Sequence, residues 1–97
     1  MARDRLDDAA IGAALTGLPG WARDGDALVR TYRRRDFVDA VALINRITEV
    51  AEAANHHPDL CLRGYRELEV RLTTHDQGGI TGRDVEVAKR IEELAGS

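Results

Sequence analysis

Hydrophobic residues recur along the chain at two different spacings, and the change between them divides the sequence into segments. Steps of three and four residues, typical of a helix with one buried face, occur in residues 8–18, 36–55 and 82–95. Residues 67–73 instead alternate, with Leu68, Val70 and Leu72 on one side and mostly charged residues on the other. This alternation predicts an antiparallel strand with one buried face and one wet face.

Short polar residues mark where the three helices begin. Asp7 or Asp8 is expected to cap the first helix, and Asp36 is expected to cap the long second helix. Thr81 and Asp84 have the spacing of a capping box at the start of the third helix. We therefore expect a side-chain oxygen to accept backbone N–H groups at each helix start.

The long helix carries a broad apolar stripe, which we expect to face the core. Its members are Phe37, Val41, Ile44, Ile47, Ala51 and Ala54. Pro58 disfavours helical geometry at His57, so the helix should end near Asn55. The helical register puts Glu52 one turn before His56, within reach of it if the helix extends that far.

Turn residues separate the remaining apolar segments into pairs of strands. Trp21 opens a short strand, Gly25-Asp26 is typical of a hairpin turn, and the chain returns over residues 27–34. A further strand is expected over residues 59–62, which turns at Arg63-Gly64 into the alternating strand. Short links favour antiparallel pairs. We therefore expect an α+β fold of order α-β-β-α-β-β-α, with a four-stranded antiparallel sheet and three helices packed on one face.

Composition and charge narrow the functional classes. A chain of 97 residues is expected to form one domain, residues 1–97. Its net charge of −3 disfavours a general nucleic-acid binder, whose affinity depends on neutralising phosphates, and Arg33-Arg34-Arg35 is more typical of a solvated strand end. No apolar run approaches the roughly 20 residues of a membrane span, and the N-terminal residues lack the apolar core of a secretory signal. The single cysteine, Cys61, excludes an internal disulfide and fits a reducing cytosol. We expect a soluble, cytoplasmic protein that binds neither nucleic acid nor membrane.

Candidate chemistry is concentrated in two short segments that carry the three histidines. His56 and His57 are adjacent at the expected end of the long helix, and His75 follows the alternating strand. Imidazole exchanges protons near neutral pH, so convergence of the three on one pocket would favour general acid–base chemistry. Neighbouring residues in an extended chain point to opposite sides, so His56 and His57 are not expected to face the same atom. The alternatives are that the histidines lie on the surface or that they cap the helix end.

Two other kinds of site are less well supported by the sequence. A metal ion could draw on His56, His57, His75 and Asp76, but their spacing matches no common zinc pattern, so we expect no metal. Cys61 lies within a predicted strand and has no activating partner that the sequence fixes. A packed thiol is therefore expected rather than a nucleophile.

Several short motifs occur in a specific order along the chain. They are Pro19-Gly20-Trp21, Asp36-Phe37, Glu52-Ala53-Ala54-Asn55-His56-His57-Pro58, Tyr65, Thr73-Thr74-His75-Asp76-Gln77-Gly78-Gly79-Ile80-Thr81 and Asp84. In this order and spacing the sequence resembles the pterin-4a-carbinolamine dehydratases over about residues 6–94. The His-His-Pro and Thr-His-Asp blocks together make the resemblance specific.

The resemblance implies the fold predicted above and also an activity. Enzymes of that family remove water from 4a-hydroxytetrahydrobiopterin (pterin-4a-carbinolamine) to give quinonoid dihydropterin, which recycles the tetrahydropterin spent by aromatic amino-acid hydroxylases. It implies that no cofactor is needed and that such a hydroxylase is a functional partner. The exposed sheet edges independently favour a homodimer or homotetramer, because unpaired strand edges are often covered by partners.

The same resemblance implies roles for particular side chains. His56 and His75 would donate and accept protons and His57 would position the pterin, so these three form the expected catalytic set. Glu52 would orient the histidine one turn on, which is His56. The expected substrate-binding residues are Trp21, Glu52, Asn55, Thr73, Thr74, Asp76 and Arg83. For Trp21 the alternative is a core anchor between helix and sheet.

Two positions depart from the family pattern. Leu60 stands where tryptophan is usual, which implies looser packing at the base of the pocket, and Arg34 replaces a residue that is commonly aromatic at the subunit surface. Neither departure changes a histidine, so an active enzyme is expected. The main rival is a non-catalytic dimerisation or assembly-factor module on the same fold, which an exposed, strongly apolar helix face would favour. A general small-molecule binder that uses the same cleft is a third possibility.

Overall fold

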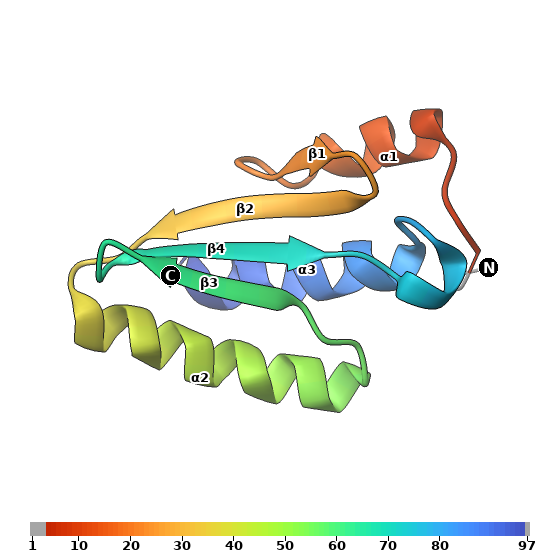
Figure 1. Ribbon diagram of the computed structural model, residues 1–97. Helices are drawn as coiled ribbons and strands as arrows, with labels where there is room; N and C mark the ends of the chain where they lie inside the picture. Colours follow the sequence, from red (N-terminus) through yellow and green to blue (C-terminus); the bar gives the residue numbers. More distant parts are fainter. Residues whose placement is uncertain (1–3, 97) are drawn as a thin grey trace.

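A four-stranded antiparallel sheet organises the protein (Figure 1). The computed structural model describes residues 4–96. The strands lie in the spatial order β1 (Ala22–Asp24), β2 (Ala27–Arg33), β4 (Glu67–Leu72) and β3 (Asp59–Arg63). Each neighbouring pair is antiparallel, and the register aligns Leu28 with Leu72 and Leu62 with Leu68. Leucines on adjacent strands are therefore paired across the sheet.

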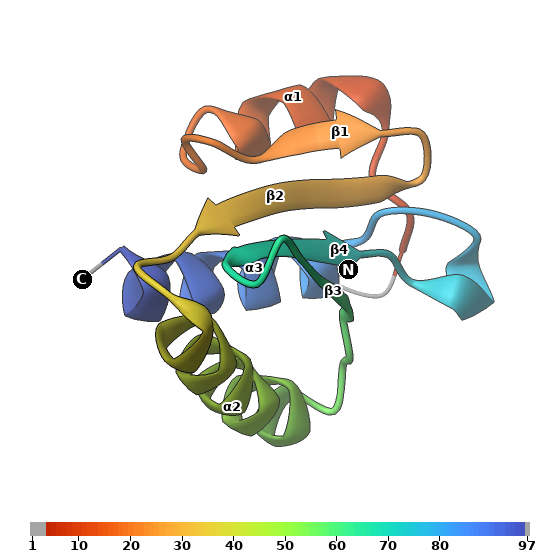
Figure 2. The same cartoon turned by 60° about the vertical axis from the view of Figure 1, so that its left-hand side comes forward.

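Three helices pack against the sheet (Figures 1 and 2). They are α1 (Asp8–Leu15), α2 (Phe37–Ala54) and α3 (Gly82–Ala95), with a short 3₁₀ helix η1 (His75–Gln77) between β4 and α3. In both views α3 runs behind the sheet, α2 lies beside β3 and α1 lies beside β1. The predicted order of helices and strands is confirmed. Among residues 4–96, no helix is both long and apolar enough to cross a membrane.

The three predicted helix starts are confirmed by their side-chain caps. Asp7 accepts the backbone N–H of Ala10 at 2.8 Å, so Asp7 rather than Asp8 caps α1. Asp36 accepts the N–H of Asp39 at 2.8 Å at the start of α2. Thr81 and the side chain of Asp84 form a capping box at α3. Each cap satisfies donors that the first turn of a helix leaves unpaired.

The buried core lies where the helices meet the inner face of the sheet. Leu68, Val70 and Leu72 of β4 are fully buried, as their alternation predicts. The same cluster contains Ile11 from α1 and Ile91 from α3, so it joins the first and the last helix of the chain to the sheet. Burying a side chain of this size is worth roughly 1.5–3 kcal/mol, and these contacts hold α3 in place along the sheet.

The predicted buried face of α2 is wrong in its first half. The buried side chains are Ala40, Leu43, Ile47 and Ala51. Phe37 is 54% exposed and Val41 is only half-buried, although both belong to the predicted stripe. The sequence from Phe37 to Ile44 is apolar at every position but Asp39, so periodicity there does not select one face. Small Ala40 allows a close approach to the core, and the bulkier neighbours are left outside.

α1 is shorter than the apolar pattern predicts. It ends at Leu15, and the chain continues through turns in which the N–H of Leu18 donates to the carbonyl oxygen of Leu15 at 3.1 Å. Leu18 is nevertheless almost completely buried. The apolar spacing therefore reports burial correctly, while the Pro19-Gly20 sequence makes the last turn irregular.

Candidate functional site

The end of α2 sets the direction of His56. Asn55 has left-handed backbone geometry, with φ of 50°. The N–H of His56 donates to the carbonyl oxygen of Ala51 at 3.1 Å, and the N–H of Asn55 donates to that of Glu52 at 3.2 Å. These two bonds form a Schellman ending, which confirms that the helix ends near Asn55. The chain leaves α2 with His56 directed towards α3.

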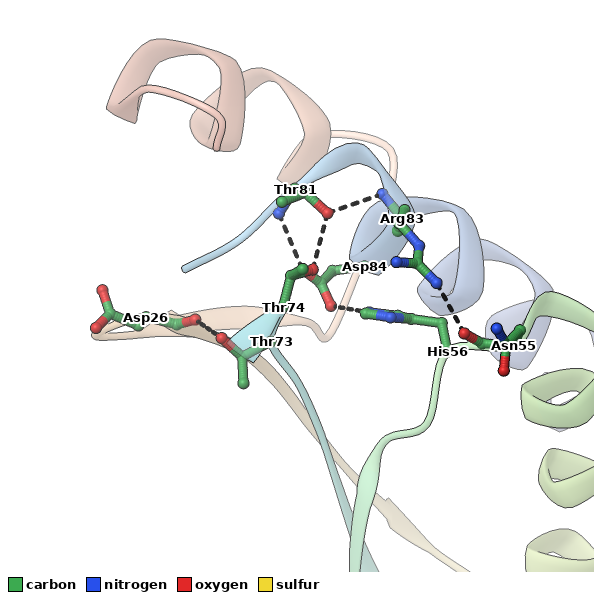
Figure 3. Close-up of polar contacts among 8 residues, drawn as sticks. All are labelled: Asp26, Asn55, His56, Thr73, Thr74, Thr81, Arg83 and Asp84. Carbon is green, nitrogen blue, oxygen red and sulfur yellow. Dashed lines mark hydrogen bonds and ion pairs between the residues drawn. The ribbon is translucent and has the colours of Figure 1, made fainter. Parts of the chain in front are cut away.

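His56 meets a buried carboxylate at the start of α3 (Figure 3). Its Nε2 lies 2.5 Å from Oδ1 of Asp84, whose side chain is fully buried. The second carboxylate oxygen, Oδ2, accepts the Thr74 hydroxyl at 2.8 Å and the backbone N–H of Thr81 at 2.9 Å. The hydroxyl oxygens of Thr74 and Thr81 are 2.8 Å apart. Asp84 is thus held by donors from three separate segments of the chain.

These contacts are the basis on which we assign the tautomer of His56. Carboxylate oxygens accept hydrogen bonds, so we assign the shared proton to Nε2 of His56 as the donor to Asp84. In the neutral imidazole, Nδ1 is then the acceptor. The arrangement is an imidazole oriented by a buried carboxylate, with the opposite ring nitrogen left to accept a proton from outside the network.

A cavity of about 400 Å³ adjoins His56 between the end of α2 and α3. Its lining consists of Ala54, His56, Gly82, Arg83, Glu86, Val87 and Arg90. Nη2 of Arg83 donates to the backbone carbonyl oxygen of Asn55 at 2.7 Å and so ties α3 to the end of α2 (Figure 3). This volume lies in the range of small-molecule sites, and charged side chains rim an apolar wall.

Glu52 contacts His57 rather than His56, so its predicted partner is wrong. Oε2 of Glu52 lies 2.5 Å from Nε2 of His57, and both side chains are more than half exposed. The helix stops before His56 would reach the position one turn beyond Glu52, and the Schellman turn sends His56 to the other side. As predicted, the two neighbouring histidines diverge. His57 lines a smaller cavity of about 140 Å³ that also includes Pro58 and Leu60.

The segment after β4 brings some predicted residues to the network and places others outside it. Thr74 is buried and bonds to Asp84, as described. Thr73 instead donates its hydroxyl to the carbonyl oxygen of Asp26, in the turn between β1 and β2, at 2.5 Å. His75 and Asp76 begin η1 and are exposed. His75 is therefore adjacent in sequence to a residue of the network, but its side chain lies in solvent.

Trp21 lies in the core and not beside the histidines. It is buried, and its ring nitrogen Nε1 donates to Oε1 of Glu92 at 3.0 Å, near the end of α3. Tyr32 donates its hydroxyl to the same oxygen at 2.7 Å, and its ring meets that of Trp21 edge to face. Burial, followed by the Glu92 carboxylate, raises the pKa of the Tyr32 hydroxyl far above its usual range. Because His56 bonds to Asp84, eight residues earlier on α3, Trp21 is an anchor at the other end of that helix.

Three residues of the site were not among the predicted site residues. Asp84 was named as a capping-box residue and as part of the family motifs but was given no role in the site, yet it is the centre of the buried network. The spacing of Asp84 from Thr81 predicted a carboxylate at the start of α3. Because this carboxylate is buried, its remaining oxygen also needs a hydrogen-bond donor, which His56 supplies. Glu86 and Arg90 line the large cavity and are joined by an ion pair of 3.7 Å. In the sequence they look like an ordinary exposed pair one helical turn apart.

The remaining alternatives from the sequence have less in the structure to support them. Within residues 4–96, no group of three or more histidine, cysteine, aspartate or glutamate side chains is arranged to hold a metal ion. Cys61 is a half-buried free thiol in β3. Proton transfer at His56 is the chemistry that the described geometry best suits.

The family model for pterin 4 alpha carbinolamine dehydratase matches residues 4–94 of the chain. The protein belongs to this dehydratase family. A Thermomicrobium roseum protein that is provisionally named a pterin-4-alpha-carbinolamine dehydratase is 53% identical over 91 residues, which cover 94% of this chain and 97% of that protein. A Nocardia farcinica protein with the same provisional name is 45% identical, over 98% of this chain and 99% of its own length.

Two solved structures support the fold of the family. A transcriptional coactivator/pterin dehydratase from Brucella melitensis superimposes with a TM-score of 0.90 at 29% identity, over 96% of this chain and all of that one. A pterin dehydratase-like protein identified as a RuBisCO assembly factor in the alpha-carboxysome gives a TM-score of 0.67 at 18% identity, over 80% of this chain and 92% of that one. The second likeness is one of fold alone.

Proposed function

We propose that this protein catalyses the dehydration of pterin-4a-carbinolamine to quinonoid dihydropterin and water. Membership of the dehydratase family supports the reaction class. The observation that carries the proposal is the His56–Asp84 pair, a buried, oriented imidazole beside a cavity of suitable size. Its chemistry is proton transfer, which is what loss of the 4a-hydroxyl requires.

The proposed reaction needs one proton acceptor and one proton donor. The C4a–O bond breaks as the leaving oxygen receives a proton, and water departs. The neighbouring ring nitrogen gives up its proton, and its electron pair forms the new bond to C4a. We assign the acceptor role to Nδ1 of His56, because Nε2 is engaged with Asp84. The resemblance to the family assigns the donor role to His75 and the positioning of the pterin to His57, which contacts Glu52, although neither side chain lines the cavity beside His56. No step calls for a metal or an organic cofactor.

The direct test is a dehydration assay with purified protein. An aromatic amino-acid hydroxylase generates the carbinolamine, and its ultraviolet absorbance is followed with and without this protein. His56→Ala and His75→Ala should each slow the catalysed dehydration by 10-fold or more, since a positioned acid or base contributes roughly 10²–10⁴-fold. Equal activity in the wild type and both variants would overturn the assigned roles.

We further propose that the protein forms a homodimer or homotetramer in the cytoplasm and acts in tetrahydropterin recycling beside a hydroxylase. Phe37 and Val38 are 54% and 76% exposed at the start of α2. With Val41, Ala42 and Asn45 they line a groove of about 320 Å³, which a second copy would cover. Sedimentation should show an oligomer that Val38→Asp weakens. A monomeric wild type would contradict this assembly.

The same groove is the observation that favours the second candidate, a non-catalytic dimerisation or assembly-factor module. An exposed apolar helix face is the feature that such a module would use. The dehydration assay separates the two functions. A wild-type protein that forms oligomers but leaves the spontaneous rate unchanged would support the module, whereas acceleration that depends on His56 supports the enzyme.

A further inference from the structure

Thr74 connects the two histidine segments of the chain (Figure 3). It directly precedes His75, and its hydroxyl donates to Oδ2 of Asp84, the carboxylate that contacts His56, at 2.8 Å. Thr74 stands at the start of η1, a position at which threonine often caps a helix with its side chain. Its side chain makes no capping bond to η1, and the residue is only 3% exposed. The hydroxyl is therefore committed to Asp84 and shielded from water.

The hydroxyl groups of Thr81 and Thr74 form a chain of hydrogen bonds that points towards Asp84. A hydroxyl has one hydrogen to donate, and Thr74 gives its hydrogen to Asp84. The two hydroxyl oxygens are 2.8 Å apart, so Thr81 is the donor of that pair. The hydroxyl oxygen of Thr81 in turn accepts the backbone N–H of Arg83 at 3.2 Å. Donors aligned in this way polarise one another, which strengthens the bond that reaches the carboxylate.

The backbone around Thr74 fixes where its hydroxyl lies. The N–H of Thr74 donates to the carbonyl oxygen of Gly79 at 3.0 Å, and the N–H of Gly79 donates to the carbonyl oxygen of Thr74 at 3.3 Å. The N–H of Gln77 donates to the same carbonyl oxygen of Thr74 at 3.1 Å. Thr74 thus closes the base of the turn that carries His75, while its side chain contacts the first turn of α3.

The donors to Asp84 bear directly on the proton of His56. Hydrogen bonds to an ionised carboxylate favour its charged form, and Oδ2 of Asp84 receives two, from the Thr74 hydroxyl and the Thr81 N–H. Without the Thr74 donor, this buried carboxylate would take up a proton more readily. A protonated Asp84 would donate to Nε2 of His56, and the neutral imidazole would then carry its proton on Nδ1.

We propose that Thr74 is a positioning residue whose hydroxyl, acting through Asp84, keeps the proton of His56 on Nε2 and leaves Nδ1 free to accept one. This role rests on the proposed function, in which Nδ1 of His56 accepts the substrate proton. The resemblance to the family placed Thr74 among the substrate-binding residues, but its hydroxyl hydrogen is used by Asp84. Loss of the hydroxyl should therefore lower the rate of reaction and leave substrate binding unchanged.

The test compares two replacements of Thr74. Thr74→Val removes the hydroxyl and keeps the size and branching of the side chain, whereas Thr74→Ser keeps the hydroxyl. At a pH at which imidazole is neutral, the nitrogen chemical shifts of His56 should show the proton move from Nε2 towards Nδ1 in Thr74→Val. In the dehydration assay kcat should fall by roughly 10- to 100-fold, the range for a hydrogen bond to a charged group, and KM should stay within about threefold. Thr74→Ser should keep the wild-type shifts and kcat.

Thr16→Val is the matched control, because it also removes a hydroxyl hydrogen bond, the one to the carbonyl oxygen of Ala13 at 2.6 Å. Thr16 is exposed at the end of α1 and lies outside the cavity beside His56. This variant should keep the shifts, kcat and KM of the wild type. If valine at position 74 prevents folding, Thr74→Ala is compared with Thr74→Ser, since both lack the methyl group and only alanine lacks the hydroxyl.

The possible outcomes separate this role from the proposed reaction. If folded Thr74→Val keeps the His56 shifts of the wild type, or if Thr74→Ser changes them equally, the role is overturned while the reaction stands. A higher KM with an unchanged kcat in Thr74→Val would also overturn it, because Thr74 would then bind the substrate. A proton shift in Thr74→Val that serine prevents supports the role even in a protein that fails to speed dehydration, a failure that would overturn only the proposed function.

Discussion

Replacement of Asp84 by asparagine should reverse the tautomer of His56 while the fold is retained. In the wild type, Oδ2 of Asp84 accepts the Thr74 hydroxyl and the Thr81 N–H, and Oδ1 accepts Nε2–H of His56. In Asp84→Asn the amide oxygen must take the place of Oδ2, because two donors point there. The amide nitrogen then faces His56. An N–H group needs an acceptor, so Nε2 of His56 has to lose its proton and Nδ1 has to carry it.

The size of the effect on stability follows from the bonds exchanged. A hydrogen bond to a charged group contributes about 1.5–3 kcal/mol and a neutral one about 0.5–1.5 kcal/mol, so the exchange at His56 should cost about 1–2 kcal/mol. The bonds from Thr74 and Thr81 survive with a neutral acceptor, which costs about a further 1 kcal/mol each. Because small proteins have about 5–15 kcal/mol of stability, Asp84→Asn should still fold. Urea unfolding followed by circular dichroism measures this loss.

The expected loss of activity is much larger than the loss of stability. With Nδ1 protonated, neutral His56 can no longer accept the substrate proton there, and the catalysed dehydration should fall by roughly 10²–10⁴-fold. Nitrogen chemical shifts of the imidazole should show the protonated nitrogen change from Nε2 to Nδ1. Asp36→Asn is the matched control, because asparagine caps a helix as well as aspartate and Asp36 lies outside the cavity. A folded Asp84→Asn variant with wild-type activity, or with an unchanged tautomer, would show that Asp84 does not set the proton position of His56.

Two further predictions concern the frame of the site. Folding raises the pKa of Tyr32, so the contribution of its hydroxyl to stability is complete below the unfolded pKa of about 10 and is lost as pH rises above it. Urea unfolding at alkaline pH should show this loss in the wild type but not in Tyr32→Phe. Identical pH profiles of the two proteins would count against the buried contact between Tyr32 and Glu92. Asn55 has a positive φ, so Asn55→Ala should lower the free energy of unfolding by about 1 kcal/mol while Asn55→Gly should not; equal stabilities of the two variants would contradict the left-handed turn.

Local signals in the sequence were sufficient for the arrangement of helices and strands. Leu68, Val70 and Leu72 alternate regularly with polar residues, so only one face of the strand can point into the core. All three are fully buried. Asp36 caps the start of the long helix, and Pro58 disfavours helical geometry just beyond its end. Both effects act within a few residues. Such features depend on neighbours in the chain, which a sequence displays directly.

Contacts between distant segments could not be obtained in the same way. Glu52 was paired with His56 because a continued helix would bring them together. The left-handed turn at Asn55 ends the helix, and Glu52 contacts His57 instead. The partner of His56 is 28 residues away, and its identity depends on how α3 packs against the end of α2. Trp21 was assigned to the pocket by resemblance, and the carboxylate that accepts its ring N–H lies near the opposite end of α3.

We propose that His56, held by Asp84, speeds the loss of water from pterin-4a-carbinolamine. The most direct measurement is the rate of carbinolamine dehydration with wild-type protein and with His56→Ala at equal concentrations of folded protein. The wild type should accelerate dehydration well above the spontaneous rate, and His56→Ala should lose roughly 10²-fold or more of that acceleration. A wild-type rate equal to the spontaneous one, or a His56→Ala variant as fast as the wild type, would contradict it.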